Sequence, residues 1–154
     1  MTGQLPPDAA LIDGVAQLLA AAGVGTYHGM ESADPYGPDV AWPIMLGRLA
    51  PDRTGLAVVG PTSDAPLDRS STRYGFQVLL RCPPTVYASS RVIATVRDAL
   101  HDRRHPPMPP GIRCTSIQLQ SHVALGRVGA FDQHSLNFTA LCARASAWAA
   151  GAAY

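Results

Sequence analysis

The stretch RYGFQVLLRC, residues 73–82, decides the fold. Its residues fall into two alternating sets, Tyr74, Phe76, Val78, Leu80 and Cys82 against Arg73, Gly75, Gln77, Leu79 and Arg81. Because successive side chains of a strand point to opposite faces, this period of two predicts a strand with one face in the core. The other face is largely polar, and two prolines end the strand at residues 83–84.

Apolar residues on either side of this strand recur at helical spacing and predict two helices. The first helix is expected over 9–22, with Asp8 as N-cap and Gly23 as C-cap. Its face with Asp13 and Gln17 is expected to meet solvent or a neighbouring subunit. The second helix is expected to start at Thr85 or Ser89 and to reach about residue 102, before Arg103 and Arg104, which suit the negative end of a helix dipole. The two apolar stripes are Leu11, Ile12, Val15, Leu18, Leu19 and Ala22, and Val92, Ile93, Val96, Ala99 and Leu100.

Other apolar runs predict further strands, separated by segments with the composition of turns. A hairpin turn at 51–54 is expected to join two of these strands, 41–49 and 55–60. The remaining strands are expected at 24–28, 112–120 and 135–144. Long exposed loops are expected at 29–39 and 61–72, a stiff proline-rich connector at 105–111, and a partly extended link at 121–134.

The order of these elements predicts an α+β fold in one domain spanning residues 1–154. Its mainly antiparallel sheet should have about five to six strands, with two main helices packed on one face. A chain of 154 residues that is 47% hydrophobic is long enough to bury a core without a disulfide or a metal. Residues 145–154 form a tail of small residues in which Trp148 and Tyr154 are possible anchors.

The composition excludes several chemistries. All twelve basic residues are arginines, so a Walker A phosphate loop and a lysine Schiff base are both impossible. The net charge of +1 does not indicate affinity for the DNA backbone. The three cysteines lack a CxxC pair and are interpreted as small core residues of a reducing compartment. No signal peptide or membrane span is expected, so the protein should be cytoplasmic when made.

The sequence contains no motif that predicts a catalytic or ligand-binding site. Gly23 and Gly25 begin a GxG pattern, but they follow a helix instead of a strand, so a helix end explains them better than a dinucleotide site. His101 and His105 have the spacing of metal ligands on a helix, but Pro106 should end the helix before His105. No serine or cysteine stands beside a histidine in a recognisable nucleophile arrangement. We therefore expect no enzyme activity, no catalytic residue, no cofactor and no metal.

The order of the expected elements and the local sequence of several segments resemble those of the tail terminator, or minor capsid, proteins of long-tailed bacteriophages. The resemblance spans about residues 8–144 and rests on the segments LIDGVAQLLAAAGVGTY, AWPIMLGRL, GLAVVG, RYGFQVLLRC, VRDALHD and SLNFTALCAR. It implies a structural virion protein that forms a hexameric ring, caps the tail tube and joins it to the head connector. DNA would pass through the ring without sequence-specific binding. The protein would lie at the head–tail junction of the virion, and in the host cytoplasm during assembly, without a membrane partner.

A ring of this kind assigns expected roles to exposed segments. Contacts between subunits are expected in the loops and the tail, at Asp64, Asp68, Arg69, Arg73, Trp148 and Tyr154. The acidic loop residues Glu31, Asp34 and Asp39 are expected to face the lumen, where they would not hold DNA phosphates. Arginines are expected to pair with aspartates of neighbouring subunits. Alternative functions are another head–tail neck or connector protein, a small cytoplasmic ligand-binding or regulatory domain, and, third, an enzyme.

Overall fold

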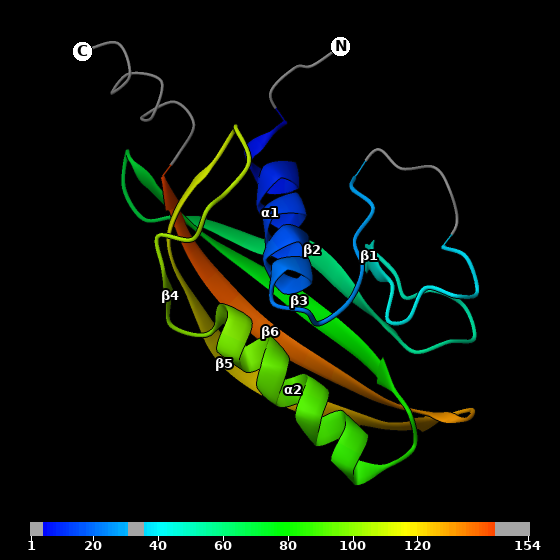
Figure 1. Cartoon of the computed structure of the whole chain (residues 1–154). Helices are drawn as coiled ribbons and strands as arrows, with labels where there is room; N and C mark the ends of the chain where they lie inside the picture. Colours follow the sequence, from blue (N-terminus) through cyan, green and yellow to red (C-terminus); the bar gives the residue numbers. More distant parts are fainter. Residues whose placement is uncertain (1–4, 31–35, 144–154) are drawn as a thin grey trace.

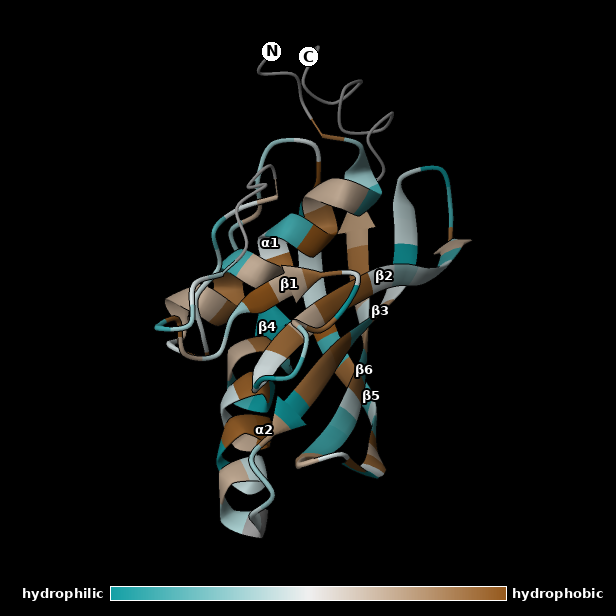
Figure 2. Cartoon of the chain, turned by 90° about the vertical axis from the view of Figure 1, so that its right-hand side faces the viewer, coloured by the Kyte–Doolittle hydropathy of each residue, from teal (hydrophilic) through white to brown (hydrophobic). Residues whose placement is uncertain are grey.

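One curled sheet organises the molecule. The computed structural model describes residues 5–30 and 36–143. Six strands lie in the order β1-β2-β3-β6-β5-β4, and every neighbouring pair except β1–β2 is antiparallel. Helices α1 (Pro7–Ala21) and α2 (Val86–Leu100) cover the same face of this sheet (Figures 1 and 2). The predicted α+β class, the antiparallel character and the placement of both helices are confirmed.

The strand predicted over 73–82 is β3 (Ser71–Cys82), and it lies between β2 (Gly55–Pro66) and β6 (Phe131–Ala143). Side chains on its helix-covered face are buried, as the alternation predicted. They meet the alternate residues of β6, because Phe76 lies directly opposite Phe138 in the ladder. The buried apolar residues of these two strands on this face are Phe76, Val78, Leu80, Cys82, Leu136, Phe138, Ala140 and Cys142.

The predicted loop over 61–72 is wrong, because most of it belongs to two strands. β2 continues to Pro66 and β3 begins at Ser71, so the two form one long hairpin. The ladder shifts register between Val59 and Ser63, where the Gly60–Pro61 peptide bond is cis. The residues of this outer half of β2 are mostly exposed. Because neither of its faces is buried, its sequence shows no hydrophobic alternation.

The predicted hairpin between residues 41–49 and 55–60 is also wrong. β1 (Ile44–Leu46) is short and runs parallel to β2, with Ile44 opposite Leu56. Residues 47–54 return the chain to the end of the sheet at which β1 begins, so that β2 can run parallel to β1. Two of these residues, Gly47 and Asp52, have positive φ. The predicted strand at 24–28 is reduced to one parallel bridge between Thr26 and Pro43.

Helix α1 is more deeply buried than its amphipathic pattern predicts. Its C-cap is Ala22, one residue before the expected Gly23, which follows it with a φ of 79°. The N–H groups of Gly23 and Val24 donate to the carbonyls of Ala20 and Leu19 and so end the helix. Its N-cap is Pro6 and not Asp8. Asp13, expected on an outer face, is only 7% exposed. Its carboxylate accepts hydrogen bonds from the Tyr27 hydroxyl at 2.6 Å and the Gln17 amide at 2.9 Å.

The contact between Tyr27 and Asp13 predicts a measurable loss of stability on substitution. Burial, followed by the hydrogen bond to Asp13, raises the pKa of Tyr27, so the phenol remains a donor. Tyr27→Phe should lower the free energy of unfolding by about 1.5 kcal/mol, because the buried carboxylate loses a charged hydrogen bond. Urea denaturation checks this value. Tyr87→Phe, at a tyrosine that is 74% exposed, is the control and should change little.

Helix α2 starts where predicted, since the Thr85 hydroxyl accepts the N–H of Ala88 at 3.3 Å. It stops at Leu100, however, and Arg103–Arg104 form the short strand β4 rather than a helix end. The turn between them places Asp102 in the left-handed region, with a φ of 56°. Strand formation is favoured there because β5 offers a free edge at Ser116 and Ile117.

The proline-rich connector 105–111 packs against α1 at Gly14. Pro106 is buried and Met108 packs against the core. A Cβ atom added to Gly14 would lie 2.3 Å from the Met108 sulfur, so the absent side chain of this glycine makes room for the connector. The connector therefore contributes to the core through its contact with α1.

The last two strands are longer than predicted. β5 (Arg113–Val128) and β6 meet in a tight turn. Residues 121–134, which were expected to form a link, are therefore paired in the β5–β6 ladder except at that turn. Three register shifts interrupt β5. The cysteines are free and buried, as predicted for core residues. Within the described ranges, no helix is long and apolar enough to cross a membrane.

Candidate assembly surface

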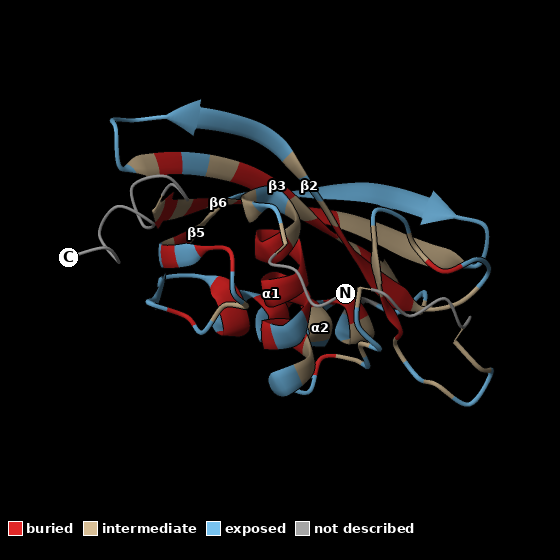
Figure 3. Ribbon diagram, turned by 90° about the horizontal axis from the view of Figure 1, so that it is seen from above, coloured by how far each residue is buried: buried red, intermediate tan, exposed pale blue. Residues whose placement is uncertain are grey.

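The tip of the β2–β3 hairpin gathers four of the residues predicted to contact neighbouring subunits. Asp64 lies near the end of β2, Asp68 and Arg69 form the turn, and Arg73 lies opposite Ala65 in the ladder. All four are exposed. The tip extends beyond both helices at one end of the sheet (Figures 1 and 3). The segment predicted to be a loop is thus a projecting β-hairpin arm.

Asp68 has a structural task within this arm. Its Oδ1 accepts the N–H groups of Ser70 at 2.7 Å and Ser71 at 2.8 Å, and the Ser70 hydroxyl at 2.8 Å. These hydrogen bonds, first those from Ser70, lower the pKa of the Asp68 carboxyl. Asp68 therefore shapes the turn that presents Arg69, and its expected role between subunits is indirect.

Removal of this carboxylate should loosen the tip alone. In Asp68→Ala, the amides of Ser70 and Ser71 should exchange with solvent faster, while the global unfolding midpoint stays the same. Because the folded-state pKa is lowered, the stabilisation is present above the ordinary carboxyl pKa of 3.8 and is lost as pH falls through the lowered value. Amide exchange and NMR shifts across pH measure both effects. Asp64→Ala, on the same arm, should leave these amides unchanged.

Of the three residues expected at the lumen, the structure describes Asp39, which does not lie on this arm. Glu31 and Asp34 lie outside the described residues, as do the expected contact residues Trp148 and Tyr154. Asp39 is exposed, and the segment that contains it, residues 36–43, lies near β1, at the opposite end of the sheet from the hairpin tip (Figure 1). Arg53 organises this loop, because its guanidinium donates to the carbonyls of Tyr36, Gly37 and Val40. The sequence did not indicate this role of Arg53, because residue 53 and residues 36–40 lie apart in the chain.

The face of the sheet away from the helices carries polar side chains, several of them paired with one another. Asn137 donates to the Ser121 hydroxyl at 2.9 Å, and Gln120 donates to the Thr139 hydroxyl at 3.0 Å. A shallow hollow of about 430 Å³ lies on this face, lined by Arg73, Ser116, Gln118, Gln120, Thr139 and Leu141. The described strand residues on this face include arginines but no acid. Alternation in β3 predicted a polar face, but only the sheet order shows that three strands share it.

A second arm projects at the other end of the sheet. Beyond Ile117, β5 is no longer paired with β4, and residues 120–128 are all exposed (Figure 3). The apolar side chains here are half exposed, at 46% for Val123 and 50% for Leu125 and Val128. Arg127 and Asp132 close the turn with an ion pair at 2.7 Å. The two arms thus point away from each other, one acidic and basic, the other largely apolar.

Two histidines face each other on this second arm. The Nε2 atom of His122 lies 2.9 Å from the Nδ1 atom of His134. Burial, and then the charge of His134, lower the pKa of His122, which favours a neutral ring in this hydrogen bond. Among the described residues no group of three or more metal-ligating side chains could hold an ion. The Nδ1 atom of His101 accepts the N–H of Leu119 at 2.9 Å. This ring nitrogen therefore serves the fold and is not free to bind a metal together with His105.

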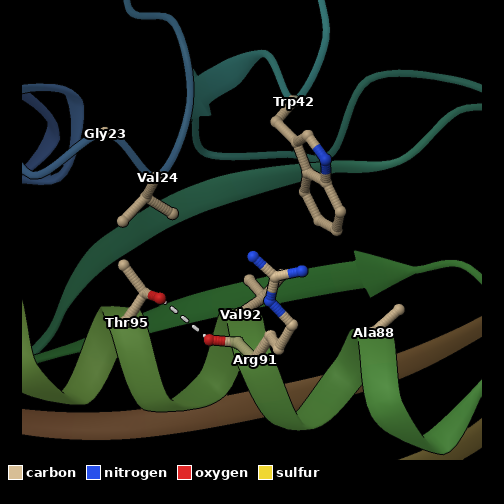
Figure 4. Close-up of a pocket in the computed structure, with 7 residues that line it drawn as sticks. All are labelled: Gly23, Val24, Trp42, Ala88, Arg91, Val92 and Thr95. Carbon is tan, nitrogen blue, oxygen red and sulfur yellow. Dashed lines mark hydrogen bonds between the residues drawn. The ribbon is translucent and has the colours of Figure 1, made fainter.

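A hollow of about 330 Å³ separates the end of α1 from α2 (Figure 4). Trp42, which has a φ of 55°, points its indole toward Arg91, while Val24 and Thr95 line the other end. Arg91 also lies 5.9 Å from the ring of Tyr87. Arg91 is the one ionisable group in the lining, so the hollow offers neither a nucleophile with a base nor a pair of carboxylates. The arrangement resembles an aromatic and arginine contact surface more than a catalytic centre.

Comparison with known proteins shows the fold. No protein-family profile and no curated protein sequence matches this chain. A chain of the solved "Virion of native gene transfer agent (GTA) particle" aligns with a TM-score of 0.60 and 19% identity, over 88% of this protein and 96% of that chain. A second solved structure aligns with a TM-score of 0.47 and 13% identity, which is too weak to support an argument. The protein therefore has the same fold as a chain of a gene transfer agent particle.

Proposed function

We propose that the protein is a structural component of a phage-like particle. The observation that carries this proposal is the fold shared with a chain of a gene transfer agent virion, over nearly the full length of both. The finer role that we propose is that of a tail terminator: a ring, expected to be a hexamer, that caps the tail tube and contacts the head connector. This role comes from the resemblance of the sequence and is supported by the surfaces described above.

The two projecting arms support assembly by contacts between unlike surfaces. A ring closes when one patch of each subunit meets a different patch of the next. The β2–β3 arm, with Asp64, Arg69 and Arg73, and the β5–β6 arm, with its half-exposed apolar residues, lie at opposite ends of the sheet (Figure 1). Each arm can therefore reach a different neighbour. Arginine–aspartate pairs across the interface would add specificity through bidentate hydrogen bonds.

DNA is the second partner that this role requires. We propose that Glu31, Asp34 and Asp39 face the channel, where carboxylates would keep phosphates from binding. The net charge of +1 is consistent with a surface over which DNA slides. Placement of all three residues far from the ring axis would contradict this part of the proposal.

The assembly test measures mass and shape with tail tubes present. Light scattering gives the mass of the free protein, and electron microscopy shows whether it forms a ring on the ends of tubes. Arg69→Glu with Arg73→Glu should weaken ring formation by at least tenfold in concentration, while Arg48→Glu, at an exposed site outside both arms, should have little effect. A protein that forms no ring alone or on tubes would contradict the terminator role. Normal rings from the double variant would contradict the role of the β2–β3 arm.

A further inference from the structure

Two of the three buried cysteines lie directly opposite each other in the sheet. Cys114 of β5 and Cys142 of β6 are partners in the ladder, and both side chains face the core, with exposed fractions of 6% and 1%. The third, Cys82, is opposite Asp132, at the far end of β6 from Cys142. In sequence the three cysteines are about equally spaced, so only the strand register singles out this pair.

The spacing typical of opposed residues fits what a disulfide needs, and the ladder shifts register directly after this pair, between Cys114 and Ser116. Directly opposite residues in an antiparallel ladder have Cα atoms about 4.5–5.5 Å apart. Disulfides connect Cα atoms about 4.4–6.8 Å apart. Since opposed side chains also leave the sheet on the same face, the two sulfur atoms can approach without moving the backbone far. We infer that Cys114 and Cys142 are a modification site, at which a low-molecular-weight disulfide such as oxidised glutathione converts the two thiols to an intrachain disulfide.

The exchange balances in two steps. The Cys114 thiolate attacks one sulfur of oxidised glutathione, breaks its S–S bond and releases one glutathione thiolate. The Cys142 sulfur, after loss of its proton, attacks Cys114 in the mixed disulfide and releases the second glutathione. Two protein thiols are oxidised, the glutathione disulfide is reduced, and both protons end on glutathione.

The structure assigns the first step to Cys114. Cys114 is the more exposed of the two, at 6% against 1% for Cys142, and its interaction with Cys142 also lowers the pKa of its thiol. In the resting protein this thiol donates to the Ser116 carbonyl at 3.5 Å. The reacting form of a thiol is its thiolate. Cys114 thus meets the reagent first and Cys142 completes the bond. By contrast, burial raises the pKa of Cys82, which has no cysteine opposite it.

Access comes from the position of the pair at strand ends. Cys114 is the second residue of β5 and Cys142 is the last but one of β6. Strand ends open locally at a lower free energy than the middle of a sheet. Brief opening there would admit glutathione and leave the Phe76–Phe138 core closed. The resulting bond would fix the base of the β5–β6 hairpin.

The disulfide would be useful to a protein that moves from a reducing to an oxidising environment. This part of the inference rests on the proposed function. A particle assembled in a reducing cytoplasm and then released meets oxidising surroundings, in which disulfides persist. The bond would then form after assembly and hold the hairpin base in the finished particle. The chemistry itself depends only on the folded chain.

The test uses the full, reduced chain in native buffer with oxidised glutathione. Thiol titration should fall from three groups to one, the intact mass should fall by two hydrogen atoms, and peptide mapping should link Cys114 to Cys142. Cys82→Ala should still lose two thiols, whereas Cys114→Ala should not form the intrachain bond. The oxidised protein should also have a higher urea midpoint than the reduced protein.

Several results would overturn the inference. A stable mixed disulfide without the intrachain bond, a link that includes Cys82, or reaction only in denaturing urea would each show that the native pair does not form the bond. Mapping on the unmodified chain decides this even if a variant fails to fold. Because the isolated subunit is used, failure of ring assembly would leave this result intact, and failure here would leave the ring unaffected.

Discussion

Phe138→Ala is expected to lower the free energy of unfolding by about 3–5 kcal/mol, the cost of deleting a fully buried aromatic ring. Phe138 is 1% exposed and stacks on Phe76 across the β3–β6 ladder, with ring centroids 5.3 Å apart and planes at 11°. The variant loses the transfer free energy of the ring and leaves a cavity between sheet and helices. Since domains have only about 5–15 kcal/mol of stability, much of the protein could unfold at moderate temperature.

Urea denaturation followed by circular dichroism measures this loss. Thr139→Ala is the matched control, because it lies next to Phe138 on β6 but on the face away from the helices. It should cost about 1 kcal/mol or less, mainly the hydrogen bond from Gln120. Equal losses in the two variants would mean that the stacked pair is not at the centre of the core.

Gly25→Ala is expected to lower the free energy of unfolding by about 3 kcal/mol, at the upper end of what overpacking costs. An added Cβ would lie 2.2 Å from the Trp42 carbonyl oxygen and 3.1 Å from Cγ1 of Ile44. The oxygen belongs to the backbone and accepts the N–H of Thr26 at 3.1 Å, so a side-chain rotation cannot relieve the contact. The variant should separate this segment from β1.

Hydrogen exchange at Ile44 reports on this separation, because its N–H donates to the Thr26 carbonyl at 2.8 Å. Exchange there should become faster in Gly25→Ala. Thr26→Ala is the control: its side chain is exposed, and both hydrogen bonds that it makes to this segment come from the backbone. If Gly25→Ala were as stable as Thr26→Ala, the close packing of these two segments would be wrong.

The sequence identified those elements whose burial pattern is local. β3 alternates with a period of two, and both helices have apolar stripes, so each was placed to within a few residues. The errors fall where long-range pairing decided the outcome. The outer half of β2 has no hydrophobic alternation, and it is a strand because β3 lies beside it. Arg103–Arg104 became a strand because β5 offered an edge.

The candidate surface was predicted in part for the same reason. Exposed charges at 64–73 were found from composition, but their shared position on a projecting arm required the hairpin. The role of Arg53, the Trp42 hollow and the sharing of the polar sheet face by three strands were missed, because each joins residues far apart in the chain. No local spacing could indicate these contacts.

By itself the sequence determined the α+β class, the central strand at 73–82, the two helices and the exclusion of lysine chemistry, because each depends on local periodicity or on the presence of a residue type. Only the tertiary structure decided strand order and register. It buried Asp13 against Tyr27, set two arms at opposite ends of the sheet, and placed Cys114 opposite Cys142. These features depend on which segments meet, and that is fixed by the lowest free energy of the whole core.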